Sequence, residues 1–134
     1  MTDTQDPRQP LSADLQRFIL ATIESVAEIE GLLLLRSTPE QGWSARALAL
    51  RLYIDEAQTA DVLKQLADRQ FLVRDHDVEA SYRYQPGSAE LREQVDRLAQ
   101  VYSTHLIAVT ELIHSKAKSR VQEFANAFRI RKDD

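Results

Sequence analysis

Apolar residues recur between positions 15 and 35 at intervals of three and four, which is the spacing of one face of an α-helix. Ser12 can cap the start of this pattern, and Ser25 with Glu28 forms a capping box within it. The pattern therefore predicts helix over about 12–36. It leaves two forms open, namely two helices with the second starting near Ser25, or one long helix with a bend.

Two shorter helical segments follow, separated by a tight turn. Ser44 can cap a helix over 45–52, and Asp55 can cap a second helix over 56–69. Two helices so close in sequence must cross at a steep angle, which is the helix-turn-helix geometry. The expected core positions of the second helix are Ala60, Leu63 and Leu66.

A hairpin is predicted directly after this helix pair. Residues 71–74 and 81–84 read as two strands, and the polar segment from Asp75 to Ala80 as the turn between them. Trp43 is expected to pack beneath the hairpin. A hairpin in this place is the wing of a winged helix.

The last third predicts helices that pack on a partner. Its apolar positions recur in alternating steps of four and three, which is a heptad seam. We expect one helix over 88–115, a break near Ala117 and a final helix, and we expect the seam to form a homodimer with help from Phe18 and Ile19. His105 is interpreted as a buried or interface histidine, with a pH- or ligand-sensing role as the alternative. The seam comprises Leu91, Val95, Leu98, Tyr102, His105, Val109 and Leu112, and the final helix would carry Val121, Phe124 and Phe128 on one face.

These elements predict a mainly α fold class, a winged helix-turn-helix with an N-terminal helix and a long C-terminal dimerisation helix. The expected organisation is a flexible leader over 1–11, a winged-helix domain over 12–87 and a helical dimerisation segment with a basic tail over 88–134. A chain of 134 residues with 43% hydrophobic and 28% charged residues suits one small globular unit.

The run from Trp43 to Asp55 resembles the second helix and turn of winged-helix regulators, including the MarR-like families. The resemblance covers about residues 25 to 86 and implies a bacterial transcription regulator that acts as a dimer on DNA. Tyr53 and Gln70 stand where these families usually have glycine, so both turns are expected to differ in detail. The residues that resemble the end of the recognition helix and the first wing strand are Leu63, Leu66, Arg69, Phe71, Leu72, Val73 and Arg74.

Composition argues against several other functions. The chain has no cysteine, and its three scattered histidines do not have the spacing of a metal site. We find no nucleophile with its base and no phosphate loop, so we predict neither an enzyme nor a cofactor. The longest apolar run, Leu32 to Leu35, is far too short to span a membrane, and the polar N-terminus is not a signal peptide. We therefore expect a cytoplasmic protein.

The net charge of −4 is unevenly distributed along the chain. The window from Lys116 to Lys132 holds six basic side chains and one acid, whereas residues 1–115 hold 18 acids and 11 basic side chains. A basic tail on an acidic body is a signal about partners. For the tail alone, a solvated helix end is the simplest interpretation, and contact with an anionic membrane or with a partner's acidic groove are the alternatives.

Candidate contacts to double-stranded DNA come from the predicted second helix and the residues around it. Gln58 and Thr59 are placed to read base edges near the helix start. Phosphate contacts are assigned to Arg46, Lys64, Arg74 and Arg83.

The acids of the same helix oppose this assignment. Residues 55–70 hold four acids against Lys64 and Arg69, and negative charge opposes the electrostatic attraction to phosphates that dominates DNA affinity. Two functions therefore remain open at this stage. One is a dimeric DNA-binding transcription regulator, and the other is a winged-helix protein-interaction module that does not bind DNA.

Overall fold

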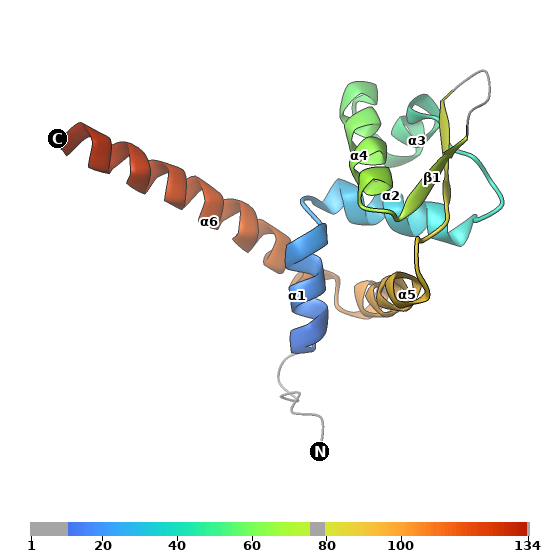
Figure 1. The fold of residues 1–134 in the computed structure, drawn as a ribbon, viewed down its shortest axis with the longest axis horizontal. Helices are drawn as coiled ribbons and strands as arrows, with labels where there is room; N and C mark the ends of the chain where they lie inside the picture. Colours follow the sequence, from blue (N-terminus) through green and yellow to red (C-terminus); the bar gives the residue numbers. More distant parts are fainter. Residues whose placement is uncertain (1–10, 76–79, 134) are drawn as a thin grey trace, which may run out of the picture.

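The computed structural model describes residues 11–75 and 80–133, with the side chains of 128–133 left out. The described elements are α1 (Ala13–Thr22), α2 (Val26–Ser37), α3 (Ala45–Leu52), α4 (Glu56–Asp68), β1 (Leu72–Asp75), β2 (Ser81–Tyr84), α5 (Ala89–Thr104) and α6 (Leu106–Asp133). In Figure 1, α2, α3, α4 and the hairpin form one body, α1 and α5 lie beside it, and α6 extends away from it. The predicted fold class, a mainly α winged helix-turn-helix, is confirmed.

Local capping explains where these helices begin. In each of five helices the capping side chain accepts the backbone N–H of the residue three positions later, which satisfies a donor that has no partner within the helix. Of the two forms expected for the N-terminal region, the structure has the one with two helices. The chain is extended between Ile23 and Ser25, so the first helix ends before the second begins. The capping residues are Ser12, Ser25, Ser44, Asp55 and Ser88.

The wing is a two-stranded antiparallel sheet in which Leu72 pairs with Tyr84 and Asp75 pairs with Ser81. Trp43 adds a short third segment, because its N–H and carbonyl both bond to the backbone of Tyr82, over 2.8 and 2.9 Å. The indole of Trp43 is buried and donates to the Thr38 hydroxyl over 3.0 Å. The interpretation of Trp43 as a packing residue of the wing is confirmed.

One hydrophobic core joins α1, the winged helix and the two C-terminal helices. Phe18 of α1 meets Phe71 edge to face, with ring centroids 6.1 Å apart, just ahead of β1. Ile19, Leu63 and Leu98, from three different helices, are fully buried in the same cluster. Leu11 is buried there too, so its assignment to a flexible leader is wrong, while residues 1–10 lie outside the described part of the chain.

The expected helix over 88–115 with a break near Ala117 is wrong. The break comes at His105, whose backbone leaves the helical region with φ −132° and ψ 48°. His105 is exposed rather than buried, and its Nδ1 lies 2.8 Å from the Thr104 hydroxyl. Helix α6 then continues to Asp133, and neither this helix nor any other in the described ranges is long and apolar enough to cross a membrane.

This break changes the meaning of the predicted seam. Val95, Leu98, Val109 and the α1 residue Ile19 lie in the chain's own core, because α5 and α6 fold back onto α1. Among the other seam residues, Leu91 and Leu112 pack against that core, as does Tyr102, whose hydroxyl donates to Glu30 of α2 over 2.9 Å. The seam therefore packs largely within one chain, and assembly with a second copy stays a prediction.

Candidate nucleic-acid interface

The turn between α3 and α4 keeps the left-handed backbone that glycine usually provides. Tyr53 has φ 58° and ψ 43°, and the next N–H, of Ile54, reaches back to the Ala49 carbonyl over 3.2 Å. Gln70 repeats this arrangement after α4 with φ 69°, where the Phe71 N–H bonds to the Leu66 carbonyl over 3.0 Å. Both turns are thus of the Schellman type without glycine, and the unusual residues change the strain rather than the path of the chain.

Of the two residues predicted to read bases, one is exposed and the other is buried in the structure. Gln58 is exposed on the first turns of α4, where base contacts were expected. Thr59 is fully buried, and its hydroxyl donates to the Asp55 carbonyl over 2.8 Å, so its assignment to DNA is wrong. The sequence held a signal for this, because Thr59 stands three, four and seven residues before buried apolar residues, namely Val62, Leu63 and Leu66. Ala60, expected in the core, is exposed instead.

The four predicted phosphate contacts fall into two pairs. Lys64 is bound to Asp68 over 2.9 Å, and Arg83 makes two hydrogen bonds of 3.1 and 3.2 Å to Asp75, which raise the pKa of Arg83. Arg46 and Arg74 are exposed, and no ion pair holds either of them within the ranges that the structure describes. Arg46 and Arg74 are therefore directly available to an anion, whereas the other two must first exchange a carboxylate for it.

The outer surface of α4 is more acidic than a count over its sequence indicates. Arg69 points inward, donating to the Thr22 carbonyl over 2.6 Å and to the buried Glu28 carboxylate over 2.8 Å. This removes one of the two basic residues from the surface. The exposed charges of the helix and its cap are then Asp55, Glu56, Asp61 and Asp68 against Lys64 alone.

The basic tail is partly neutralised inside the chain. Lys116 donates to Glu24 over 2.5 Å and to the Ile23 carbonyl over 3.2 Å, and Arg120 also binds Glu24. Hydrogen bonds from Arg120 and Lys116 lower the pKa of Glu24 to about 2. These contacts fix α6 to the junction of α1 and α2, so they set the direction in which α6 leaves the body.

Two large exposed side chains at the end of α3 were not among the predicted DNA contacts. Leu50 is 71% exposed and Tyr53 is 93% exposed. The Arg51 guanidinium lies 5.7 Å from the centre of the Trp43 ring, a cation–π distance. A separate charge count for each helix would have drawn attention to α3, because its sequence ARALALRL has two arginines and no acid.

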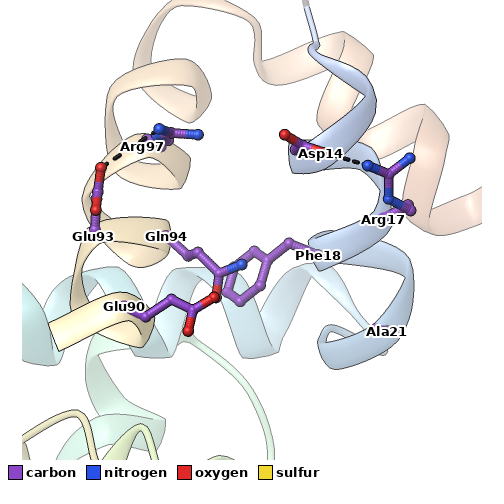
Figure 2. A pocket seen from close by; sticks show the side chains of 8 residues that line it. All are labelled: Asp14, Arg17, Phe18, Ala21, Glu90, Glu93, Gln94 and Arg97. Atoms are coloured by element: carbon purple, nitrogen blue, oxygen red, sulfur yellow. Dashed lines mark hydrogen bonds and ion pairs between the residues drawn. The ribbon is translucent and has the colours of Figure 1, made fainter. Parts of the chain in front are cut away.

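A cleft of about 570 Å³ separates α1 from α5. Figure 2 shows Phe18 reaching from α1 toward Gln94 and Glu90 of α5, with an ion pair on either side. Those pairs, Arg17 with Asp14 and Arg97 with Glu93, are exposed. Phe18, predicted at the dimer interface, thus contributes to a cleft wall as well as to the core.

Solved structures share this fold, although no family model and no curated protein sequence matches the chain. A MarR-family transcriptional regulator from Rhodococcus sp. RHA1 aligns with a TM-score of 0.52 and 16% identity, over 83% of this chain and 82% of the other. A cysteine-to-serine mutant of MarR from E. coli aligns with a TM-score of 0.51 and 13% identity, over 89% of this chain and 83% of the other. BpsR from Bordetella bronchiseptica, whose DNA binding is regulated by 6-hydroxynicotinic acid, aligns with a TM-score of 0.50 and 18% identity, over 90% of this chain and 81% of the other. The chain therefore has the MarR-like winged-helix fold.

Proposed function

We propose that this chain is a transcription regulator that binds double-stranded DNA as a homodimer in the cytoplasm. The observation that carries the proposal is the α3–turn–α4 unit followed at once by the β1–β2 hairpin, with the start of α4 exposed. In helix-turn-helix proteins the second helix enters the major groove by its N-terminal residues while the first crosses the backbone. The similar solved structures of regulators support this function at the level of the fold.

In this proposal Gln58 meets base edges, and Arg46 and Arg74 bind phosphates. Lys64 joins them by exchanging Asp68 for a phosphate, because both partners of this ion pair are exposed to solvent, which screens their attraction. Arg83 is held more firmly by its two bonds to Asp75, so its role is to place the wing as well as to contribute charge.

The homodimer is supported by the outer half of α6. Every described side chain from Ala117 to Ala127 is exposed, and Val121 and Phe124 are 68% and 74% exposed, one helical turn apart. A helix end that projects with its side chains exposed is marginal in water, and two large apolar side chains on one face favour a partner. We infer that the segment 88–134 dimerises mainly through this outer part of α6, since much of the predicted seam is in the chain's own core.

A second function rests on the acidic surface of α4. Four exposed acids against Lys64 fit a basic protein surface better than a phosphate-lined groove. In that case the winged helix is a protein-interaction module. The two functions differ in one measurable property, which is salt-dependent affinity for duplex DNA.

A fluorescence anisotropy titration with a generic duplex and with the gene's own upstream DNA, at low and high salt, tests the proposal. We expect binding that weakens steeply with salt, and a flatter salt dependence for Arg46→Ala and Arg74→Ala by about one unit of log–log slope per lost phosphate contact. Arg17→Ala on α1 is the matched control and should bind like the unaltered protein. Absence of binding to either duplex at low salt would overturn the proposal in favour of the interaction module.

A further inference from the structure

Tyr53 combines a disfavoured backbone with a side chain that packs on almost nothing. Its φ of 58° is in the left-handed region, where a Cβ atom is unfavourable and glycine is the usual residue. Its side chain is 93% exposed, so packing within the chain does not compensate for this conformation. A strained residue whose side chain is fully displayed points to a role outside the folded chain itself.

The neighbouring side chains of α3 indicate what kind of partner Tyr53 meets. Arg46 and Leu50 stand at positions i and i+4 of α3 and share one exposed face, and the exposed Tyr53 follows directly where the helix ends. No acid occurs in α3, and Arg51 beside it is oriented by the Trp43 ring. The α3 face is therefore basic and apolar, whereas the adjacent α4 face is acidic. An anionic partner matches α3 by charge.

We propose that Tyr53 contacts the DNA backbone, an inference that rests on the proposed function. In this arrangement α3 supplies the phosphate contacts, whereas the acids of α4 oppose binding to phosphates. The phenolic hydroxyl of Tyr53 donates a hydrogen bond to one phosphate, and Arg46 on the exposed face of α3 binds another phosphate. Leu50, between them, covers the intervening sugar. Tyrosine hydroxyls are among the ordinary donors to phosphate, and the first helix of a helix-turn-helix lies where the backbone passes.

The chain supplies a matched control for this proposal. Gln70 is also non-glycine and left-handed, with φ 69°, but it follows the opposite end of α4. Replacing either residue by glycine relieves the same kind of strain, so both variants should unfold at a temperature roughly 4 °C higher. Only one of them should change the affinity for DNA.

The test is an anisotropy titration with a generic 30-base-pair duplex at low salt, combined with thermal unfolding of each variant. We expect Tyr53→Gly to be more stable and about tenfold weaker in binding, and Gln70→Gly to be more stable with unchanged binding. Tyr53→Phe keeps the ring and the strain and removes only the donor, so it should unfold like the unaltered protein and bind about fivefold more weakly.

Failure of this inference and failure of the proposed function give different results. If Tyr53→Phe binds within twofold of the unaltered protein while Arg46→Ala weakens binding, the Tyr53 contact is wrong and DNA binding stands. If the unaltered protein binds no duplex, both are wrong, and the exposed α3 face belongs to a protein partner.

Discussion

Arg69 donates a hydrogen bond over 2.8 Å to Glu28, whose side chain is only 3% exposed, and so joins the end of α4 to the start of α2. The same carboxylate accepts the Glu24 N–H over 2.8 Å, and the same guanidinium reaches the Thr22 carbonyl. One ion pair thus satisfies free backbone groups at two helix ends. It also fixes α4, the helix expected to meet DNA, to the N-terminal helices.

Removing Arg69 should therefore destabilise the fold strongly. Arg69→Ala leaves a buried carboxylate with one fewer partner and no opposite charge, which costs about 3 kcal/mol, near the low end for buried pairs because Arg69 is partly exposed. Chemical denaturation measures the loss. Lys64→Ala, which breaks an exposed pair on the same helix, is the control and should leave the free energy of unfolding nearly unchanged. Equal effects of the two variants would contradict the structural role of the Arg69 pair.

The Glu24 cluster predicts a pH dependence of stability. The pKa of Glu24 is about 2 in the folded chain against 4.5 for the free group, so folding favours the ionised form. The contribution of Glu24 to the free energy of unfolding is complete above the pKa of the free group, and it is lost as the pH falls from about 4.5 toward 2. Solvent screening of the exposed Arg120 limits this contribution to about 1–2 kcal/mol.

Thermal unfolding from pH 2 to pH 7 tests this contribution. Glu24→Gln should be less stable than the unaltered protein at pH 7, and the difference should vanish near pH 2. Lys116→Ala should lose stability at pH 7 because Lys116 holds Glu24, whereas Lys118→Ala, two positions along the exposed side of α6, should not. A constant difference between Glu24→Gln and the unaltered protein across this range would show that the pair does not shift the Glu24 pKa.

Much of the fold followed from local signals. The Ser25–Glu28 capping box and the Ser44 and Asp55 caps located three helix starts, because capping depends on residues within one turn of each other. The break at His105 was not predictable in this way. Val109 returns to the same core as Leu98, so the apolar period runs on through a change of helix direction that only tertiary packing determines.

The candidate site was predicted less well than the fold. Gln58 and Arg46 are exposed as expected, but the inward turn of Arg69 depends on a carboxylate 41 positions earlier, and no local pattern records that contact. Pairing of Lys64 with Asp68 follows from their i, i+4 spacing and could have been anticipated. A charge count over a segment therefore describes the charge on the surface of α4 correctly only after inward-pointing side chains such as Arg69 have been subtracted.

Dimerisation should depend on the outer part of α6. Phe124→Asp and Val121→Asp place a charge in an apolar contact, so each should weaken the dimer about 100-fold and lower the helix content, because the freed helix end frays. Sedimentation equilibrium and circular dichroism measure the two effects. Leu50→Asp, at an equally exposed leucine on α3, is the control and should leave the dimer intact. A stable monomer of the unaltered protein at micromolar concentration would contradict the homodimer.

The acids of α4 give the prediction that best separates the two functions. Glu56→Gln and Asp61→Asn each remove a negative charge from the exposed face while nearly keeping the side-chain shape. If α4 lies in the groove, each variant should bind generic duplex a few-fold more tightly at low salt, and the gain should shrink at high salt because ions screen the lost repulsion. Glu93→Gln on α5 changes the net charge equally at a distance from α4 and should bind like the unaltered protein.

If the α4 variants bind no better than Glu93→Gln, and Arg46→Ala binds no worse, then α4 does not meet DNA. Its acidic face is then free to receive a basic protein partner, and the interaction-module function replaces the regulator.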